Sequence, residues 1–159
     1  MNANQTMVKM TFDRWNALMK QADTLFSSLT DEQLQNEIAP GKNRGIYLLG
    51  HLIAVHDSMI PLLDLGDKLY PELFEPFIAS PDKTISDLPS VTELRALWSK
   101  QMAFLAEKFD SISTDEWFQK HTAVSAEEFV VEPHRNKLNI ILTRASHLGY
   151  HMGQLILLK

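Results

Sequence analysis

Apolar side chains recur at steps of three and four residues along four long stretches of the chain. These stretches cover approximately residues 6–27, 44–65, 90–109 and 136–158. That spacing puts the apolar side chains on one stripe of a helix, so each stretch predicts an amphipathic α-helix. No convincing strand pattern is present. The sequence therefore predicts an all-α fold, a four-helix bundle with long connections, formed by residues 1–159 as a single domain.

Proline and glycine mark the connections between these helices. Pro40 and Gly41 follow the first helix, and Gly66 follows the second. Four prolines fall within residues 67–89, which predicts a long loop with at most short helical turns. Pro61 lies inside the second helical pattern, so we expect a kink or a break near it. Connections of this length are too long for a minimal up-down bundle, and at least one is expected to cross over or to wrap the outside.

Two further segments carry local signals. Ser90 is followed by Glu93 three residues later, which is the spacing of a capping box and marks the start of the third helix. Residues 120–135 fit no single element, and Phe129 to Val131 are compatible with a short extended piece.

Composition narrows the classes of function. The net charge is −5 and the Lys and Arg residues are scattered, so the electrostatic footprint of a nucleic-acid-binding protein is missing. No cysteine is present, which excludes disulfides, thiolate ligands and a cysteine nucleophile in this chain. Any thiol chemistry must therefore use a thiol that belongs to a substrate. The first ten residues lack the apolar core of a signal peptide, and no apolar run approaches the ~18 residues of a membrane span, so a cytoplasmic protein is expected.

The histidines carry the candidate chemistry. His147 and His151 lie four residues apart on the last predicted helix, which puts both imidazoles on one face, one turn apart. Two imidazoles so placed can reach one metal ion, and a third ligand must come from another helix. Periodicity leaves the choice between His51 and His56 open. His56 falls in the middle of the apolar stripe of its helix and His51 on the flank, and a buried histidine is more often a hydrogen-bonded core residue than a ligand.

The surroundings of the histidine pair have two interpretations. A polar strip runs along this face of the last helix, and its members are Thr143, His147, Tyr150, His151 and Gln154. Such a strip is usually the solvent-facing side of a helix, but it also suits the lining of a polar cavity within a bundle. Tyr150 and Gln154 are candidates for orienting an imidazole or a bound water from the second shell.

Other residues of interest are assigned structural roles. We expect Asp57, which follows His56, to be solvated, and His121 and His134 to be exposed in loops. Gly149 and Gly153 each cost roughly 1 kcal/mol inside a helix relative to alanine. Their spacing predicts the close packing of a neighbouring helix.

At these residues the chain resembles the DinB/YfiT-like superfamily of metal-dependent helical bundles. The segment from His147 to Gln154 resembles the closing HxxxHxGQ pattern of the family. The segment from Leu48 to Leu52 resembles the part of the second helix that supplies its first metal ligand, and Phe12-Asp-Arg-Trp15 resembles its first helix. The resemblance thus implies that the metal ligands are His51, His147 and His151, and that His56 lies outside the set. Family members often have arginine after the last histidine, where this chain has Met152.

The resemblance also suggests what the site does. Three neutral imidazoles leave at least one coordination position open, which is the arrangement of catalytic rather than structural sites. Relatives include thiol-dependent S-transferases and a thiol-dependent isomerase, so a transferase that uses a low-molecular-weight thiol and a small-molecule substrate is implied. A metal-dependent hydrolase and a non-catalytic, metal- or ligand-binding dimeric bundle are the alternatives. Zinc is the first expectation for the metal and nickel the second, because imidazole suits several divalent ions.

Overall fold

The computed structural model describes all 159 residues and contains four long helices. They are α1 (Ala3–Ser28), α3 (Gly45–Leu62), α4 (Val91–Asp110) and α6 (Lys137–Leu155). The connections carry short helical elements, which are α2 (Asp31–Gln35), η1 (Pro71–Leu73), η2 (Glu75–Ala79), η3 (Glu116–Phe118), α5 (Ala126–Val131) and η4 (Ile156–Leu158). The predicted all-α fold is thus confirmed, and residues 67–89 hold only short turns, as expected.

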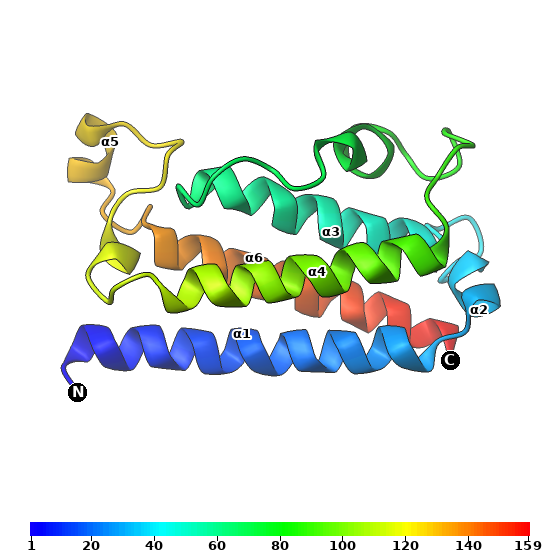
Figure 1. Cartoon of the computed structure of the whole chain (residues 1–159), viewed down its shortest axis with the longest axis horizontal. Helices are drawn as coiled ribbons and strands as arrows, with labels where there is room; N and C mark the ends of the chain where they lie inside the picture. The colour runs from blue at the N-terminus through cyan, green and yellow to red at the C-terminus, as the bar shows by residue number, and fades with distance from the viewer.

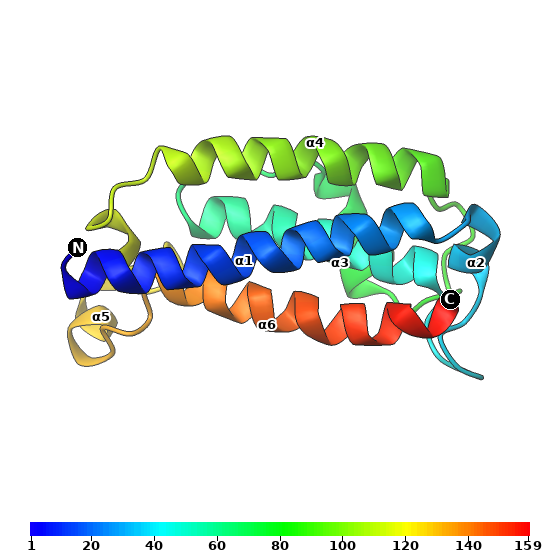
Figure 2. The same cartoon turned by 90° about the horizontal axis from the view of Figure 1, so that it is seen from below.

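The order of the helices in the bundle requires one long crossover. In Figure 1, α1 and α6 run from left to right, whereas α3 and α4 both run from right to left. Figure 2 shows α1 lying beside α6 along most of their length. Because α3 and α4 are neighbours that point the same way, the chain must return along the whole bundle between them. Residues 63–90 make this return across α3, and we refer to them as the crossover segment.

Short polar motifs set the helix starts. The Ser90 side chain accepts a hydrogen bond from the Glu93 backbone N–H, and the Glu93 carboxylate accepts from Ser90, which completes the predicted capping box. The same box, with Ser125 and Glu128, starts α5. The extended piece expected at Phe129 to Val131 is therefore wrong: these residues are helical because the cap outweighs their β-propensity.

Pro61 acts as a helix terminator. Its ring has no N–H to donate to the preceding turn, and α3 ends one residue later, at Leu62. The last carbonyl groups of α3 accept hydrogen bonds from Thr122, in a distant part of the chain. The Thr122 hydroxyl donates to the Pro61 carbonyl at 3.0 Å, and its backbone N–H donates to the Leu62 carbonyl at 3.0 Å. The break predicted at this proline is thus a clean helix end.

The core consists of two apolar clusters with a polar layer at their junction. One cluster contains Trp98 and gathers 20 buried residues around the α2 end of the bundle, and the other contains Trp15 and gathers 10 around the α5 end. His56 packs between these two indole rings, at centroid distances of 5.3 Å from Trp15 and 5.7 Å from Trp98. Asp57 and Gln101 are also buried in this layer.

Asp57 fastens the crossover segment to α3. Its carboxylate accepts hydrogen bonds from the backbone N–H groups of Leu69 at 2.8 Å and Tyr70 at 3.0 Å, and it is only 1% exposed. The expectation that Asp57 is solvated is therefore wrong. The sequence contains no signal for this role, because the two N–H groups belong to a loop whose path is set by the tertiary structure.

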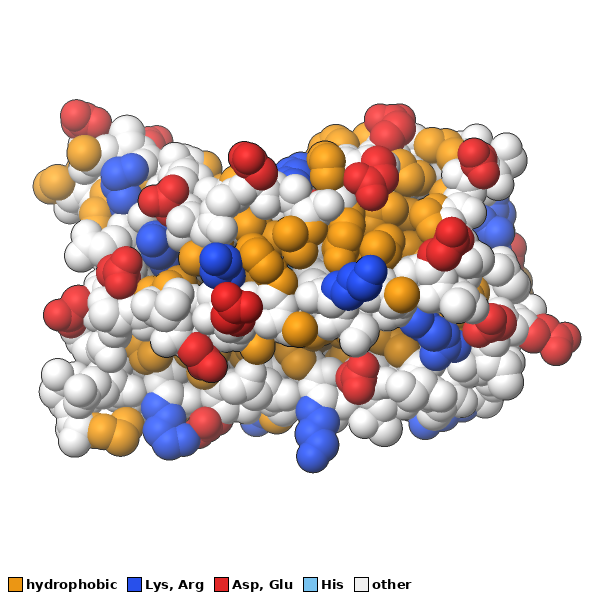
Figure 3. All heavy atoms as spheres, viewed as in Figure 1, with side chains coloured by type: hydrophobic (Ala, Val, Ile, Leu, Met, Phe, Trp, Pro, Cys, Tyr) orange, Lys and Arg blue, Asp and Glu red, His pale blue; other side chains and the backbone are white.

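A second anchor lies about two turns earlier on α3, at Gly50. Phe77 from the crossover segment is fully buried against Gly50, where a Cβ atom would stand 2.5 Å from Cδ1 of the phenylalanine ring. Nearby, the Tyr47 hydroxyl donates to the Ser80 carbonyl, and Arg44 forms an ion pair with Asp82 at 2.7 Å. Figure 3 shows apolar atoms reaching the surface between the crossover segment and α4, with acidic and basic side chains scattered singly over this face.

The apolar character of α3 follows from its central position. Its 18 residues are long and apolar enough to cross a membrane by length and composition, with a mean hydropathy of 1.2. However, 72% of that segment is buried against the rest of the protein, as is usual for the core helix of a bundle.

The burial of His56 makes folding stability depend on pH. Burial lowers its pKa to about 3, with smaller contributions from Arg144, His147 and His51. The unfolded chain takes up a proton near the ordinary histidine pKa of ~6.5, so stability is full above that pH and falls as the pH drops toward 3. Over this pH range we expect the His56→Leu variant to lose less folding stability than wild type, by a few kcal/mol. The difference follows from about 1.4 kcal/mol of stability for each unit by which the pKa is shifted. Urea denaturation of metal-free protein at pH 7 and pH 4.5 measures this difference, and parallel losses in both proteins would contradict it.

The contact of Phe77 with Gly50 predicts an asymmetry between two glycines. Gly50→Ala places a methyl group where it clashes with the aromatic ring of Phe77, and overpacking of this kind destabilises a protein by about 1–3 kcal/mol. Gly153 also lies in a helix, but an added Cβ there meets nothing within 4 Å. We therefore expect Gly153→Ala to stabilise the protein by up to about 1 kcal/mol, since alanine is the better helix former. Thermal unfolding of the two variants checks this, and equal effects would refute the tight contact.

Candidate metal centre

Three imidazoles from two helices meet on one side of the bundle. The four-residue spacing on α6 brings Nε2 of His147 to 3.0 Å from Nε2 of His151. The second helix, α3, runs in the opposite direction to α6 and brings Nε2 of His51 to 3.2 Å from that of His147. All three ligand atoms lie within 4.8 Å of one another. His51 and His147 remain partly exposed, and His151 is 9% exposed.

These nitrogens match the dimensions of a tetrahedral metal site. Two ligand nitrogens at ~2.0–2.1 Å from a zinc ion, with a tetrahedral angle between them, are roughly 3.3–3.4 Å apart. The two shortest distances in the cluster are slightly below this value, so small side-chain rotations suffice to fit an ion. No aspartate or glutamate belongs to the group, and three protein ligands leave a position open. The donor set therefore suits a divalent metal ion of the imidazole-binding kind.

Hydrogen bonds fix the orientation of two of the rings. Nδ1 of His51 lies 2.7 Å from the Phe77 carbonyl oxygen, and a carbonyl can only accept, so Nδ1 carries the proton. Nδ1 of His151 likewise lies 2.7 Å from the side-chain oxygen of Gln154. In both rings the lone pair then resides on Nε2, which is the atom that faces the other histidines. An oxygen acceptor behind the ligand is the usual arrangement of histidines at metal sites.

The protein environment keeps the α6 histidines neutral. Burial, with smaller contributions from His151, His51 and Arg144, lowers the pKa of His147 to about 4. Burial also lowers the pKa of His151, although its hydrogen bond to Gln154 opposes that shift. Only a neutral imidazole can bind a metal, because protonation removes the lone pair. Near pH 7, these two rings are therefore in the state that coordination requires.

Gln154 and Tyr150 lie behind His151. Gln154 holds the His151 ring directly, and its amide nitrogen lies 3.3 Å from the Tyr150 hydroxyl. The Tyr150 ring packs edge-on against the His151 ring at a centroid distance of 5.0 Å and is 65% exposed. Gln154 thus orients the His151 ring and Tyr150 packs against it, and the role of both residues at a bound metal stays a prediction.

The other three histidines lie apart from this cluster. His56 is fully buried on α3, but neither of its ring nitrogens has a hydrogen-bond partner, so it is not the hydrogen-bonded core histidine usually found. His134 is exposed as expected. His121 is half-buried rather than exposed, and burial lowers its pKa.

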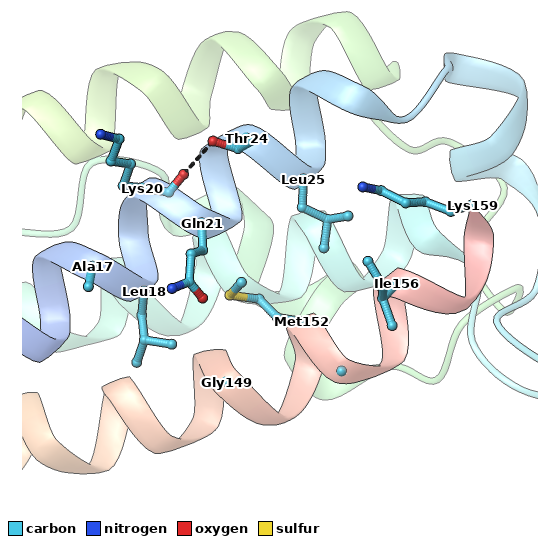
Figure 4. Close-up of a pocket in the computed structure, with 11 residues that line it drawn as sticks. Ala17, Leu18, Lys20, Gln21, Thr24, Leu25, Gly149, Met152, Ile156 and Lys159 are labelled. Carbon is cyan, nitrogen blue, oxygen red and sulfur yellow. Dashed lines mark hydrogen bonds between the residues drawn. The ribbon is translucent and has the colours of Figure 1, made fainter.

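The largest groove on the protein lies on the reverse side of α6. It has a volume of about 690 Å³ and runs between α1 and α6. Gly149 and Met152 of α6 and Ile156 of η4 form one wall (Figure 4). No helix packs closely against Gly149 or Gly153: a Cβ at Gly149 would reach only Leu18 of α1, at 4.0 Å, and one at Gly153 would reach nothing within 4 Å. The expected close helix packing at these glycines is therefore wrong.

Two features of the site were not predicted from the sequence. The first is the hydrogen-bond acceptor of His51, the backbone carbonyl of Phe77. Every residue has such a carbonyl, so the sequence cannot show which one accepts this hydrogen bond. The second is the close contact at Gly50, which the sequence does indicate. A glycine inside an apolar helix, next to a candidate ligand, is typical of a place where another segment approaches closely. That segment is the one that supplies the carbonyl.

Comparisons with known proteins place the chain in a family. A comparison with curated proteins finds no match. Among solved structures, the chain is similar to the "conserved protein of locus from Enterococcus faecalis", with 16% sequence identity, 98% of each chain covered and a TM-score of 0.49. Residues 14–155 match the sequence profile of the DinB superfamily. Since this match extends over most of the chain, the protein belongs to the DinB superfamily.

Proposed function

We propose that the protein binds one divalent metal ion through His51, His147 and His151 and uses it in the transfer of a low-molecular-weight thiol to an electrophilic substrate. The observation that carries the proposal is the convergence of three Nε2 atoms, two of them with an oxygen acceptor at the opposite ring nitrogen. Zinc is the first expectation for the ion and nickel the second, since imidazole ligands accept both.

The chemistry follows from the ligand set. A divalent ion held by three neutral imidazoles, when bound, supplies a Lewis acid that favours ionisation of a thiol or a water near neutral pH. In the transfer, the thiol sulfur forms a bond to the electrophilic carbon, the leaving group departs with its electron pair, and the thiol proton goes to solvent. The thiol must come from a co-substrate because the chain has no cysteine.

The residues of the chain have supporting roles. Phe77 and Gln154 hold the His51 and His151 rings in place through the hydrogen bonds to their Nδ1 atoms. No carboxylate belongs to the histidine group, so the chain offers no general base there. This absence favours thiol transfer over hydrolysis, since a thiol ionises more readily than water and needs less help in losing its proton.

The metal assignment predicts the metal content of the wild type and of two variants. Protein purified without a chelator should contain about one metal ion per chain, and the His147→Ala, His151→Ala double variant should contain none. His56→Leu should retain the metal, because His56 lies outside the cluster. Saturating zinc should raise the Tm of metal-stripped wild type by several degrees, since a ligand at 100 times its Kd stabilises by ~2.7 kcal/mol. Elemental analysis and thermal unfolding measure both effects, and full metal content in the double variant would overturn the assignment.

The transferase assignment predicts metal-dependent consumption of thiol. A panel of small thiols is incubated with electrophilic acceptors, and free thiol is followed for zinc- and nickel-loaded wild type and for the double histidine variant. We expect consumption by the loaded wild type only, at a rate that rises with pH as more thiol ionises. Turnover of an ester or amide without thiol would point to a hydrolase instead. Metal binding with no turnover of either kind would point to a binding protein.

A further inference from the structure

Arg144 stands on the same face of α6 as the two histidines. It precedes His147 by three residues and His151 by seven, and these intervals correspond to one and two turns of a helix. It is the first charged residue before the ligands on that face. Met152, at the position where family members often carry arginine, lies instead in the groove between α1 and α6.

Arg144 has no partner within the protein. No carboxylate forms an ion pair with it, and its Nε atom is buried with no hydrogen-bond acceptor. The side chain is half-buried, and burial is the cause that lowers the pKa of its guanidinium. Arginine is rarely withdrawn from water without a counter-charge, because burial of an unpaired ion is costly.

The neighbouring groups do not balance this charge. The three histidines are neutral as ligands, and the group contains no acidic residue. Asp57, the buried carboxylate of α3, is engaged with the backbone N–H groups of Leu69 and Tyr70. A divalent ion on the histidines adds two more positive charges. The site thus has an excess of positive charge that a ligand must offset.

A second unpaired polar atom lies close by. Nδ1 of His147 is buried without a hydrogen-bond partner, unlike the corresponding atoms of His51 and His151. Once Nε2 of His147 is used as a ligand, Nδ1 must carry the proton and become a donor. Two buried donors one helical turn apart, one of them cationic, are a suitable arrangement for binding an anionic oxygen.

We propose that Arg144 forms an anion-binding subsite next to the three histidines, and that the molecule bound at this centre is a small carboxylate- or phosphate-bearing compound. This inference rests on the proposed function in one respect. The acidic group of the bound molecule contacts Arg144, and the other end of the same molecule reaches the metal on the histidines. Arg144 acts as a specificity-determining residue: its guanidinium holds the acidic group, so compounds that bear a carboxylate or a phosphate are preferred over neutral ones of the same length.

The first experiment tests anion binding without thiol chemistry. In ¹⁵N-labelled protein, the Arg144 Nε–H resonance is assigned by its loss in Arg144→Gln. Acetate and inorganic phosphate are then titrated into metal-stripped and zinc-loaded wild type, with acetamide as the neutral control. We expect a saturable shift of this resonance with one or both anions and none with acetamide, and the anion that binds tighter identifies the preferred acidic group. The absence of a saturable shift with either anion in both forms would overturn the proposal.

The second experiment measures specificity at the metal centre. Cobalt-loaded protein is titrated with 3-mercaptopropionate and with its neutral analogue 3-mercaptopropionamide, and the visible spectrum reports binding. We expect wild type to prefer the acid roughly tenfold or more, the range for a hydrogen bond to a charged group. Arg144→Gln should abolish this preference, and Arg144→Lys should keep part of it. Arg14→Gln, which removes an exposed and unpaired arginine of α1, should leave it unchanged.

The two experiments separate failure of the subsite from failure of the proposed function. An equal preference for the acid in Arg144→Gln and wild type would overturn the role of Arg144, whatever its effect on stability. If neither thiol changes the cobalt spectrum, thiol binding at the metal fails, and the resonance titration alone then decides the anion subsite.

Discussion

The contact between Phe77 and Gly50 is the constraint on which the histidine centre depends. The ring of Phe77 can lie against α3 only because residue 50 has no side chain. This approach brings the Phe77 carbonyl to Nδ1 of His51, and that hydrogen bond directs Nε2 toward the two histidines of α6. A packing contact in the core thereby sets the proton position and the orientation of a candidate ligand.

The crossover segment, which contains Phe77, also connects the parallel helices α3 and α4. Two neighbouring helices that point the same way need a long connection, and a long loop is entropically costly unless it is fastened. Here it is fastened at three levels of α3: at Asp82 by Arg44, at Phe77 by Gly50, and at Leu69 and Tyr70 by Asp57. Each anchor uses a different interaction, namely an ion pair, an apolar contact and a carboxylate that accepts two backbone hydrogen bonds.

Burial and charge act together at the centre of the bundle. The environment that holds His56 neutral also lowers the pKa of His147 and His151, so the imidazoles are ready for a metal at neutral pH. No carboxylate shares the site with them. The positive charge of a bound ion and of Arg144 is therefore left for the ligand to offset, which links the electrostatics of the centre to the kind of molecule that it selects.

The sequence by itself determined the four helices, their capped starts and the face shared by His147 and His151, since all of these follow from local periodicity and short capping motifs. It left His51 and His56 as equal candidates, because periodicity describes one helix at a time and says nothing of what lies opposite. Resemblance to the family favoured His51, and the tertiary structure brought that residue to the α6 pair and His56 to the two tryptophans. The roles of Asp57, Phe77 and the unpaired Arg144 were likewise decided only by the fold. Asp57 binds backbone N–H groups of a distant segment, Phe77 offers its backbone carbonyl to His51, and Arg144 lacks a partner. No local pattern of side chains predicts any of these features.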